Sequence, residues 1–175
     1  AVEFFRGFLH EGLAHCVENV PVYVWHSSVM YAKLEEALVA EGLLPHQQIV
    51  WVKPTIIPTF CFYHFQHEPC IFCWPKGHRP RRTKNAKGCS SVWAVDWQGL
   101  QRPGKIEPVS GYHPTQKPVE LFSIPIRNHT VRGDICYEPF AGSGGQIIAA
   151  EQLGRICCAI EIAPAYCDLI VRRWA

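Results

Sequence analysis

Hydrophobic positions in the first half of the chain change period several times, and each period predicts an element. Residues 3–17 carry apolar side chains at helical spacing, which predicts an amphipathic helix. Residues 20–26 form a β-rich apolar run, and helical spacing returns between Met30 and Leu38. A further apolar run at 49–53 is followed by Pro54, which predicts a short strand that ends there. This alternation of strands and helices predicts an α/β fold.

The pattern breaks after residue 54 and returns near residue 118. Aromatic residues at 60–74 predict strands or a hairpin with irregular connections, and the polar stretch 75–91 predicts a loop. The remaining periods predict, in chain order, a helix from Pro118 that Pro125 kinks, a strand at 134–138, a helix at 144–153, a strand at 155–161 and a helix at 164–174. Residues 1–175 are therefore predicted to form a single domain.

Composition places the chain among ordinary globular proteins. It has 175 residues, of which 48% are hydrophobic and 18% charged, and its net charge of +2 means that any strongly basic surface must be local. No apolar run approaches the roughly 18 residues of a membrane span, and from the first residues of this sequence we expect no signal peptide. The nine cysteines are odd in number and several lie in apolar runs, which predicts reduced thiols and a cytoplasmic protein.

A glycine turn between a predicted strand and a predicted helix is the first candidate site. Gly142 and Gly144 would let a ligand approach the backbone at the start of the helix, and Glu161 ends the next strand, where a carboxylate can accept ribose hydroxyls. Position 147 is isoleucine, so the third glycine of a dinucleotide fingerprint is missing. The turn favours a nucleoside cofactor over NAD; the alternative is a tight turn that binds no ligand.

Three segments in a fixed order resemble the amino-group DNA methyltransferases. Residues 139–144 (Pro-Phe-Ala-Gly-Ser-Gly) resemble motif I of this family, Glu161 its motif II acid, and residues 113–118 (His-Pro-Thr-Gln-Lys-Pro) its motif X. A motif X that precedes motif I is typical of the circularly permuted β-type branch. Further similarity covers most of the chain, at residues 23–26, 49–53, 67–69, 166–168 and 172–174.

The resemblance implies a Rossmann-like S-adenosylmethionine-dependent methyltransferase sheet, incomplete, with helices on both faces and a short irregular insertion. Residues 1–74 would be the substrate half, 75–112 the target-recognition insertion and 113–175 the cofactor half. Glu138 stands where the family more often has aspartate. The residues implied to hold S-adenosylmethionine are Thr115, Gln116, Lys117, Pro118, Glu138, Phe140, Gly142, Ser143, Gly144 and Glu161.

The catalytic tetrapeptide of the family is missing from this sequence. The family lifts a base out of the duplex and positions its amino group with an Asp-Pro-Pro-Tyr-type motif IV. This chain has no Pro-Pro dipeptide, and Asp96, Asp134 and Asp168 lie in no comparable setting. We therefore expect a chain truncated at the N-terminus and at the C-terminus, with no catalytic residue of its own, inactive as given but still able to bind cofactor in part. The implied reaction is methylation of adenine N6, with cytosine N4 as the alternative.

A run of basic residues without acids is the candidate DNA contact. Between residues 76 and 95 the basic residues are Lys76, Arg79, Arg81, Arg82, Lys84 and Lys87. Cations beside aromatic rings suit phosphate contact and base stacking, which predicts double-stranded DNA as the partner; the alternative is a solvated basic loop. The resemblance implies a bacterial or phage origin and leaves the choice between monomer and homodimer open.

Four other interpretations compete with this one. Cys70 and Cys73 have a zinc-ligand spacing, but on one strand they would point to opposite faces, so we expect no metal. The pieces Glu18-Asn19-Val20 and Pro69-Cys70 mimic cytosine-C5 methyltransferases but occur in reversed order. A non-catalytic remnant that binds DNA or cofactor, and a methyltransferase with a non-DNA substrate, also remain open.

Overall fold

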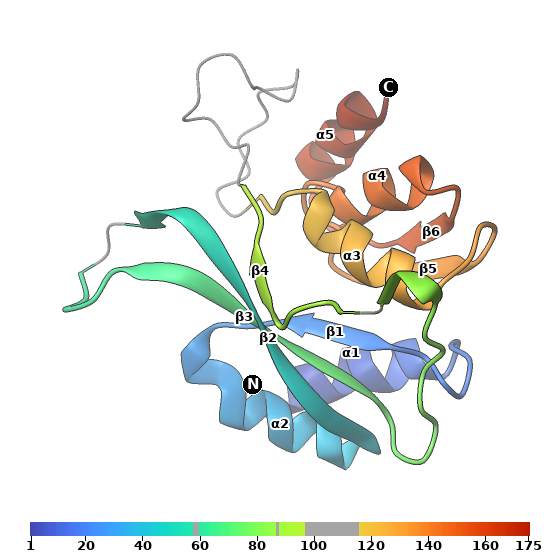
Figure 1. The fold of residues 1–175 in the computed structure, drawn as a ribbon, viewed down its shortest axis with the longest axis horizontal. Helices are drawn as coiled ribbons and strands as arrows, with labels where there is room; N and C mark the ends of the chain where they lie inside the picture. The colour runs from blue at the N-terminus through green and yellow to red at the C-terminus, as the bar shows by residue number, and fades with distance from the viewer. Residues whose placement is uncertain (58–59, 87, 97–115) are drawn as a thin grey trace. The chain divides into compact units, whose positions relative to one another are not determined.

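The computed structural model describes residues 1–57, 60–86, 88–96 and 116–175, which form two compact units (Figure 1). Unit 1 comprises Ala1–Arg82 and Lys87–Ala94, and unit 2 comprises Thr83–Ala86 and Val95–Ala175. The predicted single domain, with its insertion at 75–112, stays a prediction. None of the helices in the described ranges is long and apolar enough to cross a membrane.

Unit 1 is a four-stranded sheet with helices packed on one face. Its strand order is β1-β3-β2-β4, with β3 antiparallel to both of its neighbours and β4 parallel to β2. The helices and strands are α1 (Val2–Leu13), β1 (Val22–Trp25), the 3-10 turn η1 (Ser28–Met30), α2 (Tyr31–Ala40), β2 (Leu43–Ile57), β3 (Phe65–Pro75) and β4 (Val92–Ala94). The predicted elements are confirmed, and the aromatic stretch after residue 60 supplies the hairpin strand β3.

The prediction that Pro54 ends the second strand was wrong, because β2 continues to Ile57. β4 pairs with β2 only from Val50 to Val52, so the part of β2 that holds Pro54 has no neighbour on that side in the described residues. On the other side, the register with β3 shifts between Val52 and Ile57. The missing N–H of Pro54 therefore breaks no regular ladder, which is how proline is tolerated at a strand edge.

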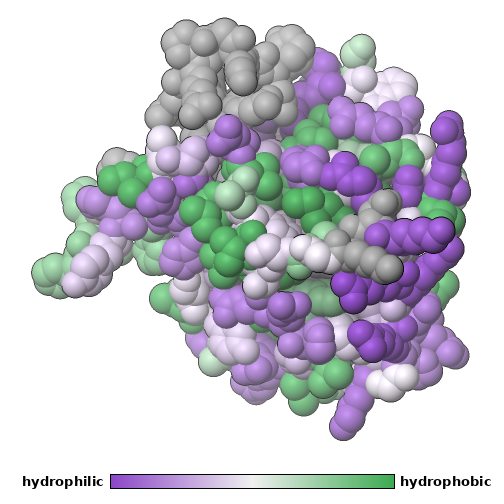
Figure 2. Space-filling view, in the orientation of Figure 1, coloured by the Kyte–Doolittle hydropathy of each residue, from purple (hydrophilic) through white to green (hydrophobic). Residues whose placement is uncertain are grey.

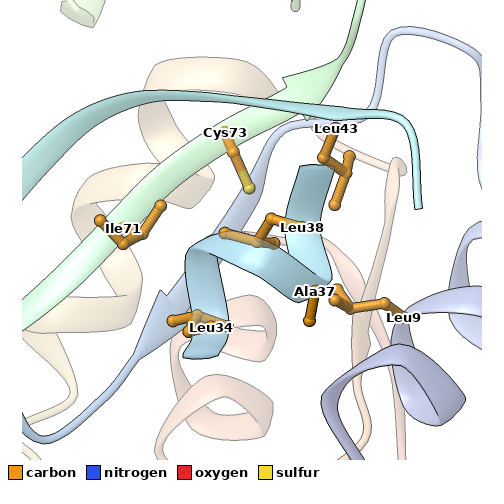
Figure 3. Close-up of a cluster of buried hydrophobic side chains, with 7 residues drawn as sticks. All are labelled: Leu9, Leu34, Ala37, Leu38, Leu43, Ile71 and Cys73. Atoms are coloured by element: carbon orange, nitrogen blue, oxygen red, sulfur yellow. The ribbon is translucent and has the colours of Figure 1, made fainter. Parts of the chain in front are cut away.

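The core of unit 1 lies between the sheet and its two helices (Figure 3). Alternating residues of β3 and helical-face residues of α2 point toward one another there, because strands repeat every two residues and helices every three to four. The buried members are Leu9, Leu34, Ala37, Leu38, Leu43, Ile71 and Cys73. The opposite sheet face is aromatic: the Trp25 ring lies edge-on to Trp51 and Trp93, at centroid distances of 6.4 and 6.2 Å.

Unit 2 contains two parallel strands joined by a helix. Its elements are the 3-10 turn η2 (Lys84–Ala86), α3 (Glu120–His129), β5 (Ile135–Glu138), α4 (Gly145–Gln152), β6 (Ile156–Ala159) and α5 (Pro164–Trp174). β5 and β6 pair in parallel from Ile135 opposite Ile156 to Glu138 opposite Ala159. The predicted elements are again confirmed, and α3 runs on through Pro125. Parallel pairing brings the carboxyl ends of both strands to one edge, which is where α/β folds bind ligands.

Candidate functional site

The turn from β5 into α4 needs glycine at two positions. Gly142 and Gly144 have φ angles of +53° and +78°, in the left-handed region that favours glycine. The N–H of Gly144 donates to the carbonyl of Ala141 at 2.8 Å, which closes the turn directly before the helix. The turn therefore presents backbone at the N-terminus of α4, as the glycine pattern predicted.

Side chains of unit 2 press against this turn. A Cβ atom at Gly144 would lie 2.8 Å from Cγ1 of Ile170, and one at Gly145 would lie 2.5 Å from Cε2 of Phe122. Both distances are too short for a real Cβ. Arg173 of α5 donates to the carbonyl of Ser143, whose side chain is buried. The turn is thus fixed by packing as well as by its own hydrogen bonds.

Glu161 connects the end of β6 to the glycine turn. Its Oε2 atom accepts the N–H of Gly142 and its Oε1 atom accepts the N–H of Ala163, each at 2.8 Å. A carboxylate oxygen can accept two hydrogen bonds, so each oxygen keeps one acceptor position. This acid therefore holds the turn in place and can still accept hydroxyl groups of a ligand.

Glu138 occupies the corresponding place at the end of β5. Its Oε1 atom accepts the N–H of Phe140 at 2.9 Å. Burial raises the pKa of the Glu138 carboxyl, while the hydrogen bond from Phe140 and the positive charge of Lys117 act in the opposite direction. Lys117 therefore lies close enough to interact electrostatically with the carboxyl end of β5.

Most of the ten predicted cofactor residues can be located. Thr115 lies outside the described residues. Gln116 and Lys117 are half-buried and Pro118 is buried, and the Pro118 carbonyl accepts the N–H of Leu121 at the start of α3. The other six residues lie at or after the carboxyl ends of β5 and β6, and they are Glu138, Phe140, Gly142, Ser143, Gly144 and Glu161. Their role in binding a cofactor stays a prediction.

The described basic residues predicted to contact DNA are exposed, and all of them except Lys84 lie in irregular backbone. The predicted loop at 75–91 is confirmed in its described part, apart from Pro75, which ends β3, and the short turn η2. Lys76, Arg79, Arg81 and Arg82 are exposed in unit 1, Lys84 is exposed in unit 2, and Lys87 lies outside the described residues. DNA contact by these residues stays a prediction.

Sequence reasoning missed an ion pair across β2 and β3. Nζ of Lys53 lies 2.6 Å from Oε1 of Glu68, and it also lies 5.3 Å from the ring centroid of Trp51. The pairing of Trp51 with Glu68 puts these residues on one sheet face. The register of the hairpin between β2 and β3 would have predicted this ion pair, but the sequence alone does not fix that register.

The cysteines with zinc-ligand spacing lie in β3 and are both buried. Cys73 belongs to the core beneath α1 and α2, whereas Cys70 pairs with Trp25 and Ile49 on the aromatic face. Within the described ranges, no three His, Cys, Asp or Glu side chains gather as a metal site would require. The zinc interpretation thus gains no support from the described residues.

Comparison with known proteins identifies the family. A family model described as DNA methylase (N6_N4_Mtase) matches residues 36–172. The chain belongs to this DNA methylase family. The type II methyltransferase M2.MboI of Moraxella bovis is 29% identical over 136 residues, which cover 72% of this chain and 48% of the relative. The chain spans about half the length of such curated relatives.

Solved structures share the fold of this chain. The M1.HpyAVI complex with SAM superposes with a TM-score of 0.78 at 21% identity, covering 99% of this chain and 81% of that one. The cytosine-N4-specific PvuII DNA methyltransferase gives a TM-score of 0.82 at 16% identity, covering 99% of this chain and 70% of that one. The predicted methyltransferase-like α/β fold and the family resemblance are therefore confirmed.

Proposed function

We propose that this chain binds S-adenosylmethionine and double-stranded DNA, and that the whole protein methylates the exocyclic amino group of a base, adenine N6. The observation that carries the proposal is the hydrogen bond between Glu161 and the N–H of Gly142, which joins a strand-end acid to a glycine turn. Membership of the DNA methylase family and the SAM complex of M1.HpyAVI support it.

The residues present fit this cofactor. The turn at Gly142 and Gly144 offers backbone without side chains, and Glu161 keeps acceptor positions that ribose hydroxyls can use. When bound, S-adenosylmethionine supplies a methyl group on a positively charged sulfur. Phe140 is half exposed beside the turn, so its ring can cover a nucleoside. Residues 115–118 would close over the methionine end, as the resemblance implies.

The reacting amine has to be presented to the methyl group by other residues. In the proposed transfer the amine lone pair would form the new N–C bond, the electrons of the C–S bond would remain on sulfur, and the amine would then lose one proton. No four consecutive residues in this sequence match the family tetrapeptide that orients the amine. We propose that the chain as given binds cofactor without transferring the methyl group.

Two measurements test the proposal. Isothermal titration calorimetry with S-adenosylmethionine is expected to show binding to the chain, and no binding would overturn the cofactor assignment. The whole protein is then produced from its complete gene in a host without N6-adenine or N4-cytosine methylation, and DNA nucleosides are analysed by mass spectrometry.

N6-methyladenine in that DNA would support the proposal. N4-methylcytosine would instead identify cytosine N4 as the methylated group. Unmodified DNA would contradict amino-group methylation of DNA. In that case, cofactor binding without DNA binding by the chain would favour a non-DNA substrate. Binding of both without any modified base would favour a non-catalytic remnant.

A further inference from the structure

β2 and β3 continue beyond the pairing with β4 as a two-stranded arm of unit 1 (Figure 1). We call residues 53–57 and 60–67 the aromatic arm. Phe60, Phe62 and Tyr63 at its tip are each exposed over at least 90% of their surface. The space-filling view shows hydrophobic residues at the end of this arm (Figure 2). These rings contribute nothing to the core of the unit.

The root of the arm is held firmly. Trp51, in the part of β2 that pairs with both β3 and β4, is 2% exposed, and Nζ of Lys53 lies over its ring. Lys53 also pairs with Glu68 at 2.6 Å, and Nε2 of Gln66 donates to the Lys53 carbonyl at 3.2 Å across the hairpin. These contacts tie both strands together below the tip, so the rings project from a braced hairpin.

The chemistry of the tip selects its partner. Several adjacent exposed aromatic rings mark an interaction surface, because solvent-exposed rings gain nothing from folding. No aspartate or glutamate occurs from Gly42 to His67, and the first carboxylate after this stretch, Glu68, pairs with Lys53. The arm therefore carries no carboxylate that would repel phosphate groups.

We infer that the aromatic arm stacks its tip rings on unstacked bases of the DNA substrate. This inference rests on the proposed function, since an amino group inside a base pair becomes accessible only after its nucleotide leaves the stack. Apolar side chains inserted between base steps hold such a distortion open, and aromatic rings stack on any base. The arm thus binds opened DNA through its rings, whatever the recognition sequence.

The test compares three triple variants in which Phe60, Phe62 and Tyr63 all become alanine, leucine or tryptophan. The probes are single-stranded oligothymidine and a mixed-sequence duplex, and binding is measured by fluorescence anisotropy over a range of salt concentrations. We expect the alanine variant to lose roughly tenfold or more in affinity for oligothymidine, with an unchanged salt slope because the rings neutralise no phosphate. Phe4→Ala, which removes an exposed ring on α1, is the control and should bind as the unaltered chain does.

The leucine and tryptophan variants separate stacking from general apolar contact. Tryptophan is expected to preserve affinity, whereas leucine, which is apolar without a ring, is expected to lose it. Irradiation of a 5-iodouracil-substituted oligonucleotide should crosslink within residues 60–65 of the unaltered chain.

Binding that the alanine variant keeps in full would overturn the arm inference alone. The arm inference would also be overturned if analytical ultracentrifugation showed that the unaltered chain is a dimer and the alanine variant a monomer with the same DNA affinity. No binding of either probe by the unaltered chain would overturn both the arm inference and the DNA part of the proposed function.

Discussion

The carboxylate of Glu161 accepts the backbone N–H of Gly142 at 2.8 Å, although the two residues lie 19 positions apart. The other carboxylate oxygen accepts the N–H of Ala163. One side chain therefore fixes the glycine turn after β5 and the entry into α5 after β6. Because the bonds involve backbone donors at both places, the acid shapes the candidate site before any ligand arrives. The proposed contact with a ribose would be its second role.

Glu161→Ala is expected to weaken binding of S-adenosylmethionine by at least tenfold, because the variant loses both the ribose acceptor and the anchor of the turn. Two partly buried N–H groups lose their partners, which should lower the free energy of unfolding by about 1–3 kcal/mol. Glu161→Gln keeps one acceptor oxygen and should recover part of the stability. Calorimetry and urea denaturation measure the two effects separately.

Glu151→Ala is the matched control, since Glu151 is exposed on α4 of the same unit. It should leave both cofactor affinity and stability close to those of the unaltered chain. An unchanged affinity in Glu161→Ala would remove the ribose role from this residue, whatever happens to stability.

Gly144→Ala should destabilise the protein, whereas Gly7→Ala should stabilise it. Gly144 has a φ of +78°, and its added Cβ would lie 2.8 Å from Ile170. The left-handed conformation alone costs a non-glycine residue about 1–2 kcal/mol. Gly7 lies within α1 with open space around its Cβ position, where alanine gains about 0.5–1 kcal/mol. Thermal denaturation should show a lower Tm for Gly144→Ala and a higher Tm for Gly7→Ala than for the unaltered chain. Equal changes in Tm would contradict the packing described for the turn.

Local periodicity was sufficient to predict the helices of both units and most of their strands, but it did not predict β4 as a separate strand. It could not predict that β3 lies between β1 and β2, since strand pairing depends on contacts between distant parts of the chain. Pro54 shows the same limit. A proline predicts a strand end from local rules, and only the absence of a ladder partner on its side lets β2 continue.

The candidate site was predictable in its residue types and order but not in its internal bonds. The order of strand, turn and helix predicted the glycines of the site. The position of Glu161 after the next strand predicted that residue. The bond from Gly142 to Glu161 depends on parallel register between β5 and β6, which no local pattern fixes. The exposed rings at the tip of the aromatic arm were likewise read only as strand or hairpin residues, since local sequence does not show where a hairpin leaves its sheet.

Glu138→Gln is expected to raise stability at neutral pH. Burial raises the pKa of this carboxyl, so folding favours its protonated form. The stability that the group contributes is complete below its ordinary pKa of 4.5 and is lost as pH rises through the raised value in the folded state. Glutamine keeps an oxygen that can accept the N–H of Phe140 but carries no charge.

The difference in unfolding free energy between this variant and the unaltered chain should therefore grow as pH rises through that window and then level off. Urea denaturation at a series of pH values measures it. A difference that stays constant with pH would show that burial does not oppose the ionisation of Glu138.

Replacing Arg79, Arg81 and Arg82 with glutamine should weaken DNA binding and flatten its dependence on salt. Each phosphate contact contributes about 0.9 to the slope of log affinity against log salt, so three lost contacts should reduce the slope by roughly 2.7. Anisotropy titrations with a mixed-sequence duplex measure this slope.

The control neutralises three exposed cations elsewhere, Lys33, Arg132 and Arg172, and should leave the slope unchanged. Equal slopes for both triple variants would mean that residues 76–82 form a solvated basic loop. A selective loss would instead assign DNA contact to this surface of unit 1, because a slope reports the number of phosphates neutralised and does not respond to general loss of stability.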